Sequence, residues 1–345
     1  MNFKLFTTRC RLGLALLGAT VLLGGAGLHA QNATVDPTDT QVFTLRAGWN
    51  AIDLRVDPLD PTPGVVFAHV PVDKVATYFP LETPVEFIQN PTEKPWKSRG
   101  WNAWFAPALP ESAISDLFAI GGGHCYLVHS TAPATLSVVG AVIQRRVRWQ
   151  ADSYNFVGFP VDPVSPPTFQ AWFAGSTNHQ STQRTIVYTL GANDTWQPVS
   201  NPGATVIQPG AAYWVFCEGD SDYQGPLDVS APTGVENAMD FGSTTETLDL
   251  QIINNLFNPD GVTLQLDPTN SLPLSYQQRT LSLGQIVSVS FTDAASFGSL
   301  ESGAKLQLRL TLDRAGMTQT NGAAVITVRD DVGSLIRIPV TGQLP

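Results

Sequence analysis

Short segments in which apolar and polar residues alternate recur along this chain and predict β-strands. The alternation is clear in VFTLRAGWNAIDLRV (42–56) and VRWQADSYNFVGFPV (147–161), as expected for strands with one buried face. After residue 233 it returns in ETLDLQIIN, KLQLRLTLD and AAVITVRD. Helical periodicity is limited to ESAISDLFAI (111–120) and FQAWFAG (169–175). The pattern therefore predicts an all-β fold with minor α content.

The chain contains one pattern twice. GWNAIDLRVDP matches SYNFVGFPVDP at an offset of 155 − 50 = 105 residues, since Asn50 aligns with Asn155. GGGHCYLVHS matches QPGAAYWVFC at an offset of 213 − 126 = 87 residues, since Tyr126 aligns with Tyr213. The first copy is longer in its middle by 105 − 87 = 18 residues, and the second has one extra residue near Asp152. The copies share turn residues and aromatic residues, which indicates a doubled scaffold rather than a doubled active site.

The repeat and the turn sequences divide the chain into four parts. Without its first 30 residues the chain has 345 − 30 = 315, more than one hydrophobic core usually supports. We assign residues 1–30 to a signal peptide, 42–140 to β-rich repeat unit 1 and 141–231 to β-rich repeat unit 2. Residues 233–345 carry short alternating strands separated by NPDG, SLESG and DDVG turns, which predicts an immunoglobulin-like β-sandwich.

The N-terminus has the pattern of a secretory signal peptide. Lys4, Arg9 and Arg11 lie close to the start, the apolar run LGLALLGATVLLGGAGL follows, and cleavage is predicted after Ala30. An uncleaved membrane anchor is the alternative, which the glycines of the run and the lack of a stop-transfer charge disfavour. No later stretch is apolar enough to span a bilayer. We expect a secreted or cell-surface protein, with the periplasm as an alternative location.

The charge balance narrows the classes of partner. After cleavage 19 − 3 = 16 basic and 29 acidic residues remain, a net charge of −13. This disfavours DNA, RNA and anionic membranes, because each of them requires basic patches. The one basic cluster, Arg145-Arg146-Val147-Arg148, is typical of the solvated face of a strand. Polysaccharides or other cell-surface proteins are the expected partners, and nucleic acid is not.

Two family resemblances follow from longer motifs. MDFGSTTETLDLQIIN (239–254) and LTLDRAGMTQTNGAAVITVRDDVGSLIRIPVTG (310–342) resemble BACON-type bacterial immunoglobulin-like modules. The matching residues are Phe241-Gly242, Asp313-Arg314, Gly316, Gly322, Gly333 and Pro339-Val340. The repeat units resemble a GWNLIsLPV…YWV repeat of large secreted bacterial proteins. The first resemblance implies a spacer in a secreted carbohydrate-active or surface protein.

The residues that could carry chemistry are few. There is no G-x-S-x-G elbow, H-E-x-x-H, Walker loop or EF-hand spacing. His124 and Cys125 are metal-ligand types, but neighbours on a strand point to opposite faces. Asp57 and Asp162 each precede a proline, which is typical of turns rather than of a calcium site. We therefore expect no metal, no cofactor and no catalysis. An enzyme with a site at the repeat interface is an alternative, and it requires a polar cleft shared by both copies.

Aromatic residues and cysteines supply the remaining candidates. Exposed aromatic rings beside polar groups suit the flat faces of sugars, and the candidates for carbohydrate binding are Trp101, Trp104, Trp172 and Trp196. The alternative places these tryptophans in the cores of units that have few aliphatic residues. Cys125 and Cys217 are candidates for a disulfide in an oxidising compartment. They lie at non-equivalent points of the two copies, which favours two buried free thiols.

Overall fold

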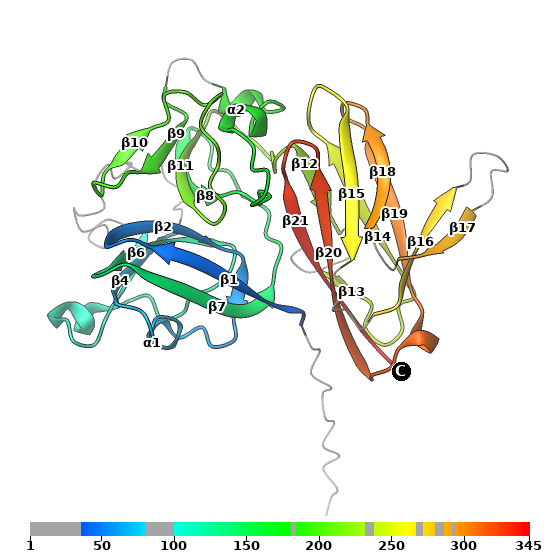
Figure 1. The fold of residues 1–345 in the computed structure, drawn as a ribbon, viewed down its shortest axis with the longest axis horizontal. Helices are drawn as coiled ribbons and strands as arrows, with labels where there is room; N and C mark the ends of the chain where they lie inside the picture. The colour runs from blue at the N-terminus through cyan, green and yellow to red at the C-terminus, as the bar shows by residue number, and fades with distance from the viewer. Residues whose placement is uncertain are drawn as a thin grey trace, which may run out of the picture. The chain divides into compact units, whose positions relative to one another are not determined.

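The computed structural model describes residues 36–79, 100–180, 184–231, 238–266, 272–279, 286–291 and 294–345. The signal peptide proposed for residues 1–30 and the segment 80–99, which contains Trp96, lie outside the described residues. Nearly all regular structure is β, and Figure 1 shows its helices as short pieces only. This confirms the predicted all-β fold with minor α content.

The first copy forms two antiparallel sheets over one core. One sheet has the order β2-β6-β4-β5 and the other β1-β7-β3. The strands are β1 (Thr38–Leu45), β2 (Gly48–Leu54), β3 (Val56–Pro58), β4 (Val72–Tyr78), β5 (Trp101–Phe105), β6 (His124–Ser130) and β7 (Ala134–Val142). Helix α1 (Pro63–Val66) and the 3-10 helix Pro110–Ile114 lie in the connections, and the second overlaps the start of the predicted helical segment 111–120. Phe43, Leu54, Tyr126 and Leu136 are part of the buried core that both sheets cover.

The second copy contributes one sheet of order β10-β9-β11-β8. Its strands are β8 (Ser153–Gly158), β9 (Val187–Leu190), β10 (Trp196–Pro198) and β11 (Ala212–Cys217). The segment GAND (191–194) forms the turn of a hairpin, because β9 and β10 pair directly across it. Helix α2 (Phe169–Trp172) begins after Thr168, whose hydroxyl accepts a hydrogen bond from the backbone N–H of Ala171.

Strand register confirms the alignment of the two copies. In the first copy Asn50 of β2 is opposite Val128 of β6, and in the second Asn155 of β8 is opposite Val215 of β11. The partners differ by 155 − 50 = 105 and 215 − 128 = 87, the two offsets that the sequence predicts. Both copies are therefore built on the same strand pair.

Asn50 and its counterpart Asn155 make equivalent hydrogen bonds in the two copies. Asn50 Oδ1 accepts the N–H of Arg46 at 2.9 Å, and its amide donates to the Arg46 carbonyl at 3.0 Å. Asn155 makes the same two bonds with Gln150, at 2.7 and 3.2 Å. The loop is one residue longer in the second copy, and Asp152 takes a left-handed φ of 52° there. The extra residue predicted near Asp152 is thus accommodated without losing the asparagine bonds.

The C-terminal region is a β-sandwich. Its sheets have the orders β12-β14-β19-β16-β17 and β13-β21-β20-β15-β18, and only the β13–β21 pair among the described strands is parallel. The strands are β12 (Leu227–Ser230), β13 (Met239–Asp240), β14 (Thr247–Asn254), β15 (Asp260–Leu266), β16 (Leu274–Arg279), β17 (Ile286–Ser290), β18 (Ala294–Leu300), β19 (Lys305–Leu312), β20 (Asn321–Asp330) and β21 (Leu335–Gln343). Alternate residues of β14 are buried in one core with Ile326 and Ile338, which confirms the predicted immunoglobulin-like architecture.

One strand differs from the sequence assignment. β12 was assigned to the end of the second copy, but it pairs with β14 and extends the sandwich. Val142 of the first copy, which is equivalent to Val229 of β12, pairs with Val56. In the second copy the corresponding valines separate: Val229 pairs with Ile252 of β14, and Val161 forms a bridge to Ser334. In the second copy, residues of the sandwich thus replace the partners that pair with each other in the first copy.

Candidate functional site

Aromatic side chains from both copies form one shared core. Tyr78 and Trp101 of the first copy meet Phe156 and Trp214 of the second. The ring centroids of Tyr78 and Trp214 are 5.4 Å apart, and those of Trp101 and Phe156 are 6.1 Å apart. These separations and tilted arrangements are the favourable ones for aromatic pairs. The duplicated units are therefore joined by a buried aromatic interface.

Three of the four candidate tryptophans lie in the interior. The exposed fraction is 5% for Trp101, 1% for Trp172 and 7% for Trp196. Because stacking on a sugar requires an open ring face, the structure corrects the expectation that these three rings form a binding surface. Trp104 is half-buried and stacks on Phe67 with the centroids 6.0 Å apart. The alternative interpretation of core tryptophans therefore describes Trp101, Trp172 and Trp196.

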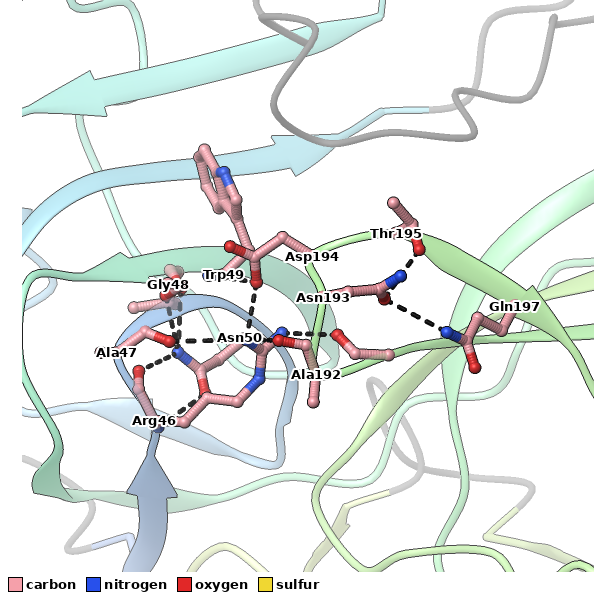
Figure 2. A network of polar contacts seen from close by, with 12 residues as sticks. Arg46, Ala47, Gly48, Trp49, Asn50, Ala192, Asn193, Asp194, Thr195 and Gln197 are labelled. Carbon is pink, nitrogen blue, oxygen red and sulfur yellow. Dashed lines mark hydrogen bonds and ion pairs between the residues drawn. The ribbon is translucent and has the colours of Figure 1, made fainter.

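A polar contact fastens the β9–β10 loop of the second copy to the first (Figure 2). Arg46 Nη1 lies 2.6 Å from Asp194 Oδ1, and the same oxygen accepts the N–H of Trp49 at 3.0 Å. The guanidinium also donates to the carbonyls of Gly191 at 2.8 Å and Ala192 at 3.1 Å. The asparagine-anchored loop of the first copy therefore doubles as a docking point for the second.

A cleft of about 920 Å³ lies between the copies, and we call it the repeat cleft. The first copy lines it with residues that include Asp53, Arg55 and Cys125, and the second copy lines it with residues 154–158. The segment 143–150, at the start of the second copy, forms a further wall. The polar cleft that the enzyme alternative requires is therefore present.

The chemistry of the repeat cleft centres on Asp53 and Cys125. Cys125 Sγ lies 3.7 Å from Asp53 Oδ1, and Arg55 Nη2 lies 2.6 Å from Asp53 Oδ2. Burial, and then the nearby Asp53 charge, raise the pKa of the Cys125 thiol well above its usual value. The thiol is therefore protonated at neutral pH, whereas a nucleophilic cysteine requires a thiolate. His124 is its neighbour on the same strand and contacts Arg145, so this pair does not form an activated dyad.

The cysteines do not form a disulfide. Cys125 and Cys217 are both free and buried, as the favoured interpretation of their positions predicts. Burial raises the pKa of the Cys217 thiol to about 11. In the second copy Cys217 pairs with Ser153, and in the first copy its counterpart Ser130 pairs with Gly48.

A second cleft, of about 530 Å³, lies where both copies meet the sandwich, and we call it the junction cleft. Its lining includes Val56, Val142, Val161 and Val229. The first two form the strand pair that closes the first copy, and the last two are the separated counterparts in the second. The junction cleft therefore adjoins the place where the second copy lacks the strand pair that closes the first.

In the second copy, side-chain contacts replace the backbone pairing that β1 makes in the first copy. Residues 143–150 correspond to residues 39–46, which include nearly all of β1, but they form no strand. Arg146 instead makes a bidentate ion pair with Asp228, with Nη2 at 2.8 Å from Oδ2. Gln144 donates to the carbonyl of Val229 at 2.9 Å, and Gln224 accepts the N–H of Val147 at 2.8 Å. Contacts through these long side chains leave space between the two segments, which direct backbone pairing would fill.

Ion pairs also connect the sandwich to both copies. Arg337 of β21 pairs with Asp39 of the first copy, and Arg329 of β20 pairs with Asp162 of the second. The backbone of Asp162 donates to the carbonyl of Gly333 at 2.8 Å. The three parts thus meet through charged and backbone contacts.

Sequence reasoning missed the arginines of this junction. Arg145 and Arg146 were assigned to a solvated strand face, but both line the junction cleft with Arg55, Arg329 and Arg337. The usable signal was the position of the basic cluster, which lies where one copy ends and the next begins. The other three arginines, Arg55, Arg329 and Arg337, lie in no local sequence motif.

Two absences hold for the part of the chain that the structure describes. Within those ranges, no group of three or more His, Cys, Asp or Glu side chains is arranged to hold a metal ion. Over the same part of the chain, no helix is long and apolar enough to cross a membrane.

Comparison with known proteins gives weak structural similarities only. No protein-family model matches the chain, and no curated protein matches it. A FixG-related protein from Vibrio parahaemolyticus is 15% identical, with a TM-score of 0.22 over 34% of this chain and 96% of its own. The PapD-like domain 7 of human CEP192 is 15% identical, with a TM-score of 0.21 over 35% of this chain and 85% of its own. The Enterococcus faecalis MSCRAMM ACE is 9% identical, with a TM-score of 0.20 over 90% of this chain and 84% of its own.

Proposed function

We propose that this chain is a secreted or cell-surface protein with a non-catalytic structural and binding role. The observation that carries the proposal is the junction cleft, a ligand-sized cavity walled by both copies and by the sandwich. The shared aromatic core and the Arg46–Asp194 contact support a scaffold that fixes the copies against each other. Secretion rests on the signal-peptide pattern of residues 1–30.

The opposing hypothesis is an enzyme that works in the repeat cleft. Asp53 is its best general-acid or general-base candidate, because it is 5% exposed and lines that cleft. Its Arg55 partner and the protonated Cys125 thiol support a structural role instead. Gly158 of the second copy also packs directly on the Asp53 side chain, where a Cβ would overlap it.

The test is a hydrolase assay on the secreted chain and on Asp53→Asn, with peptide, ester and glycoside substrates. Asp220→Asn is the matched control, because Asp220 is exposed and does not line the repeat cleft. We expect no activity above background in any of the three proteins. An activity that Asp53→Asn loses and Asp220→Asn keeps would refute the non-catalytic role.

Carbohydrate binding is the alternative binding function, and of its four candidate residues it now rests on Trp104. Tryptophan fluorescence titration with a polysaccharide panel tests it, with Trp104→Ala as the variant. A saturable response that Trp104→Ala removes would establish this alternative.

A further inference from the structure

The charge of the junction cleft is opposite to that of the chain. The chain carries a net charge of −10, yet among the residues that the structure describes five arginines line this cleft and Asp39 is the one acidic residue that does. They are Arg55, Arg145, Arg146, Arg329 and Arg337. A cleft with one sign of charge and low-dielectric walls concentrates ligands of the other sign.

The carboxylate partners of three of these arginines lie behind them. The side chain of Arg55 is 36% exposed and that of its partner Asp53 is 7% exposed. The exposed fractions are 37% for Arg329 and 11% for its partner Asp162. They are 31% for Arg146 and 17% for its partner Asp228. The three partner aspartates do not line the junction cleft. The accessible side of each of these pairs is therefore the guanidinium.

A guanidinium held in this way retains donors for a ligand. Arg329 and Arg337 each reach their aspartate through Nη1, and a guanidinium has five N–H donors in a planar fork. That fork matches a carboxylate through two parallel hydrogen bonds. The ion pairs also hold the arginines in place before a ligand arrives, which lowers the entropic cost of binding.

The rest of the cleft surface selects the body of the ligand. Aliphatic side chains form much of it, among them Val56, Val142, Val161, Val229 and Leu335. Phe159 is the one aromatic side chain among the described lining residues and is 3% exposed, so its ring offers no open face for a sugar. A volume of about 530 Å³ is within the range of small-molecule sites.

We propose that the junction cleft binds the carboxylate of a small ligand with an aliphatic body, which the arginines hold by charge-assisted hydrogen bonds. The same chemistry is offered by the C-terminal residue of a peptide and by a free aliphatic acid. This inference deepens the proposed binding role by naming the ligand class. Binding weakens as salt is added, because the attraction is between charges.

The experiment is ligand-observed NMR on the full secreted chain. N-acetyl-leucine stands for a peptide C-terminus and hexanoate for a free aliphatic acid. N-acetyl-leucinamide removes the charge at nearly constant shape, and glucuronate supplies a carboxylate without the aliphatic body. We expect binding by one or both aliphatic acids, and their relative affinity distinguishes the two sources.

Two variants place the binding in the cleft. Val42→Trp fills it without removing a charge, since Val42 lines the cleft and is 59% exposed, and Val65→Trp is the control on α1 at 52% exposure. Arg337→Gln removes one guanidinium, with Arg309→Gln on β19 as its control outside the cleft. We expect Val42→Trp to abolish binding and Arg337→Gln to weaken it roughly tenfold. Thermal unfolding of each variant verifies that it is folded.

Three results would overturn the assignment. They are equal binding of the amide analogue, binding of glucuronate without the aliphatic acids, and unchanged binding by the Val42→Trp variant. Absence of binding by every probe would overturn it as well. None of these results affects the hydrolase comparison, which tests the proposed non-catalytic role separately.

Discussion

The two copies use the same strand pair but close it differently. In the first copy β1 pairs with β7 from Thr38 to Leu45, and β3 pairs with the other edge of β7. In the second copy the counterpart of β1 forms no strand, and the counterpart of the β7 end pairs with β14 of the sandwich. Duplication thus preserved the central ladder, while the edge diverged to attach a further module and leave a cleft.

The comparison predicts its largest effect at the interface that the copies share. Trp214 is 2% exposed, and its ring meets Tyr78 of the other copy at 5.4 Å. We expect Trp214→Ala to lower the free energy of unfolding by about 3–5 kcal/mol, because it leaves a cavity in a core common to both copies. Urea-induced unfolding measures this. Trp104→Ala, at a half-buried position in the first copy alone, is the control, and an equal loss there would contradict the shared core.

The second copy also contains a buried histidine whose protonation is expected to destabilise the fold. His179 is 3% exposed between Trp149 and Phe173, with ring centroids 4.2 and 4.8 Å away. Burial lowers the pKa of His179 from 6.5 to about 4, so the folded state binds fewer protons than the unfolded state between these values. Stability is therefore lost as the pH falls from about 6.5 to about 4, by up to about 3 kcal/mol.

Urea unfolding of the wild type and of His179→Phe across this pH range checks the effect. Phenylalanine retains the stacking but cannot titrate, so we expect a smaller loss of stability on acidification. The Ser176 hydroxyl, 2.7 Å from His179 Nδ1, loses a partner in the variant, which lowers stability equally at every pH. Parallel pH profiles for the two proteins would show that His179 is not the sensor.

The matched tyrosines offer a comparison within the conserved part. The Tyr126 hydroxyl accepts the N–H of Gly121 at 2.8 Å and donates to its carbonyl at 2.9 Å. The Tyr213 hydroxyl accepts the N–H of Gln208 at 2.9 Å. We expect Tyr126→Phe and Tyr213→Phe each to cost about 1–3 kcal/mol, with the first the larger because it loses two bonds. Denaturant unfolding of both variants in parallel ranks them, and the reverse order would contradict this account.

The smallest expected effect concerns the thiols. Cys125 and Cys217 are buried and free, and burial raises the pKa of both. We expect neither to react with a thiol reagent in the native state, and both to react at once after unfolding without a reductant. A native thiol that titrates rapidly at neutral pH would contradict their structural role. Reaction only after reduction would indicate a disulfide.

The sequence was informative where local pattern decides structure. Alternation located the strands, and the Asn50–Asn155 and Tyr126–Tyr213 matches located the repeat, because these residues bond to backbone groups close by in sequence. It was not informative where distant segments meet. The destination of β12 depends on competition between two sheets, and the burial of Trp101 depends on how the copies pack. Three arginines of the junction cleft, Arg146, Arg329 and Arg337, are likewise held by contacts more than 80 residues apart in sequence, such as Arg146–Asp228 at a separation of 82.

Backbone hydrogen exchange tests the central difference between the copies most directly. The comparison is between amides of residues 42–45 in β1 and those of residues 146–149, their counterparts in the second copy. The first set lies in a ladder with β7, whereas Val147 donates to the side chain of Gln224. We expect the second set to exchange roughly ten times faster or more, since strand hydrogen bonds are absent there. Equal protection of the two sets would show that the second copy is closed like the first.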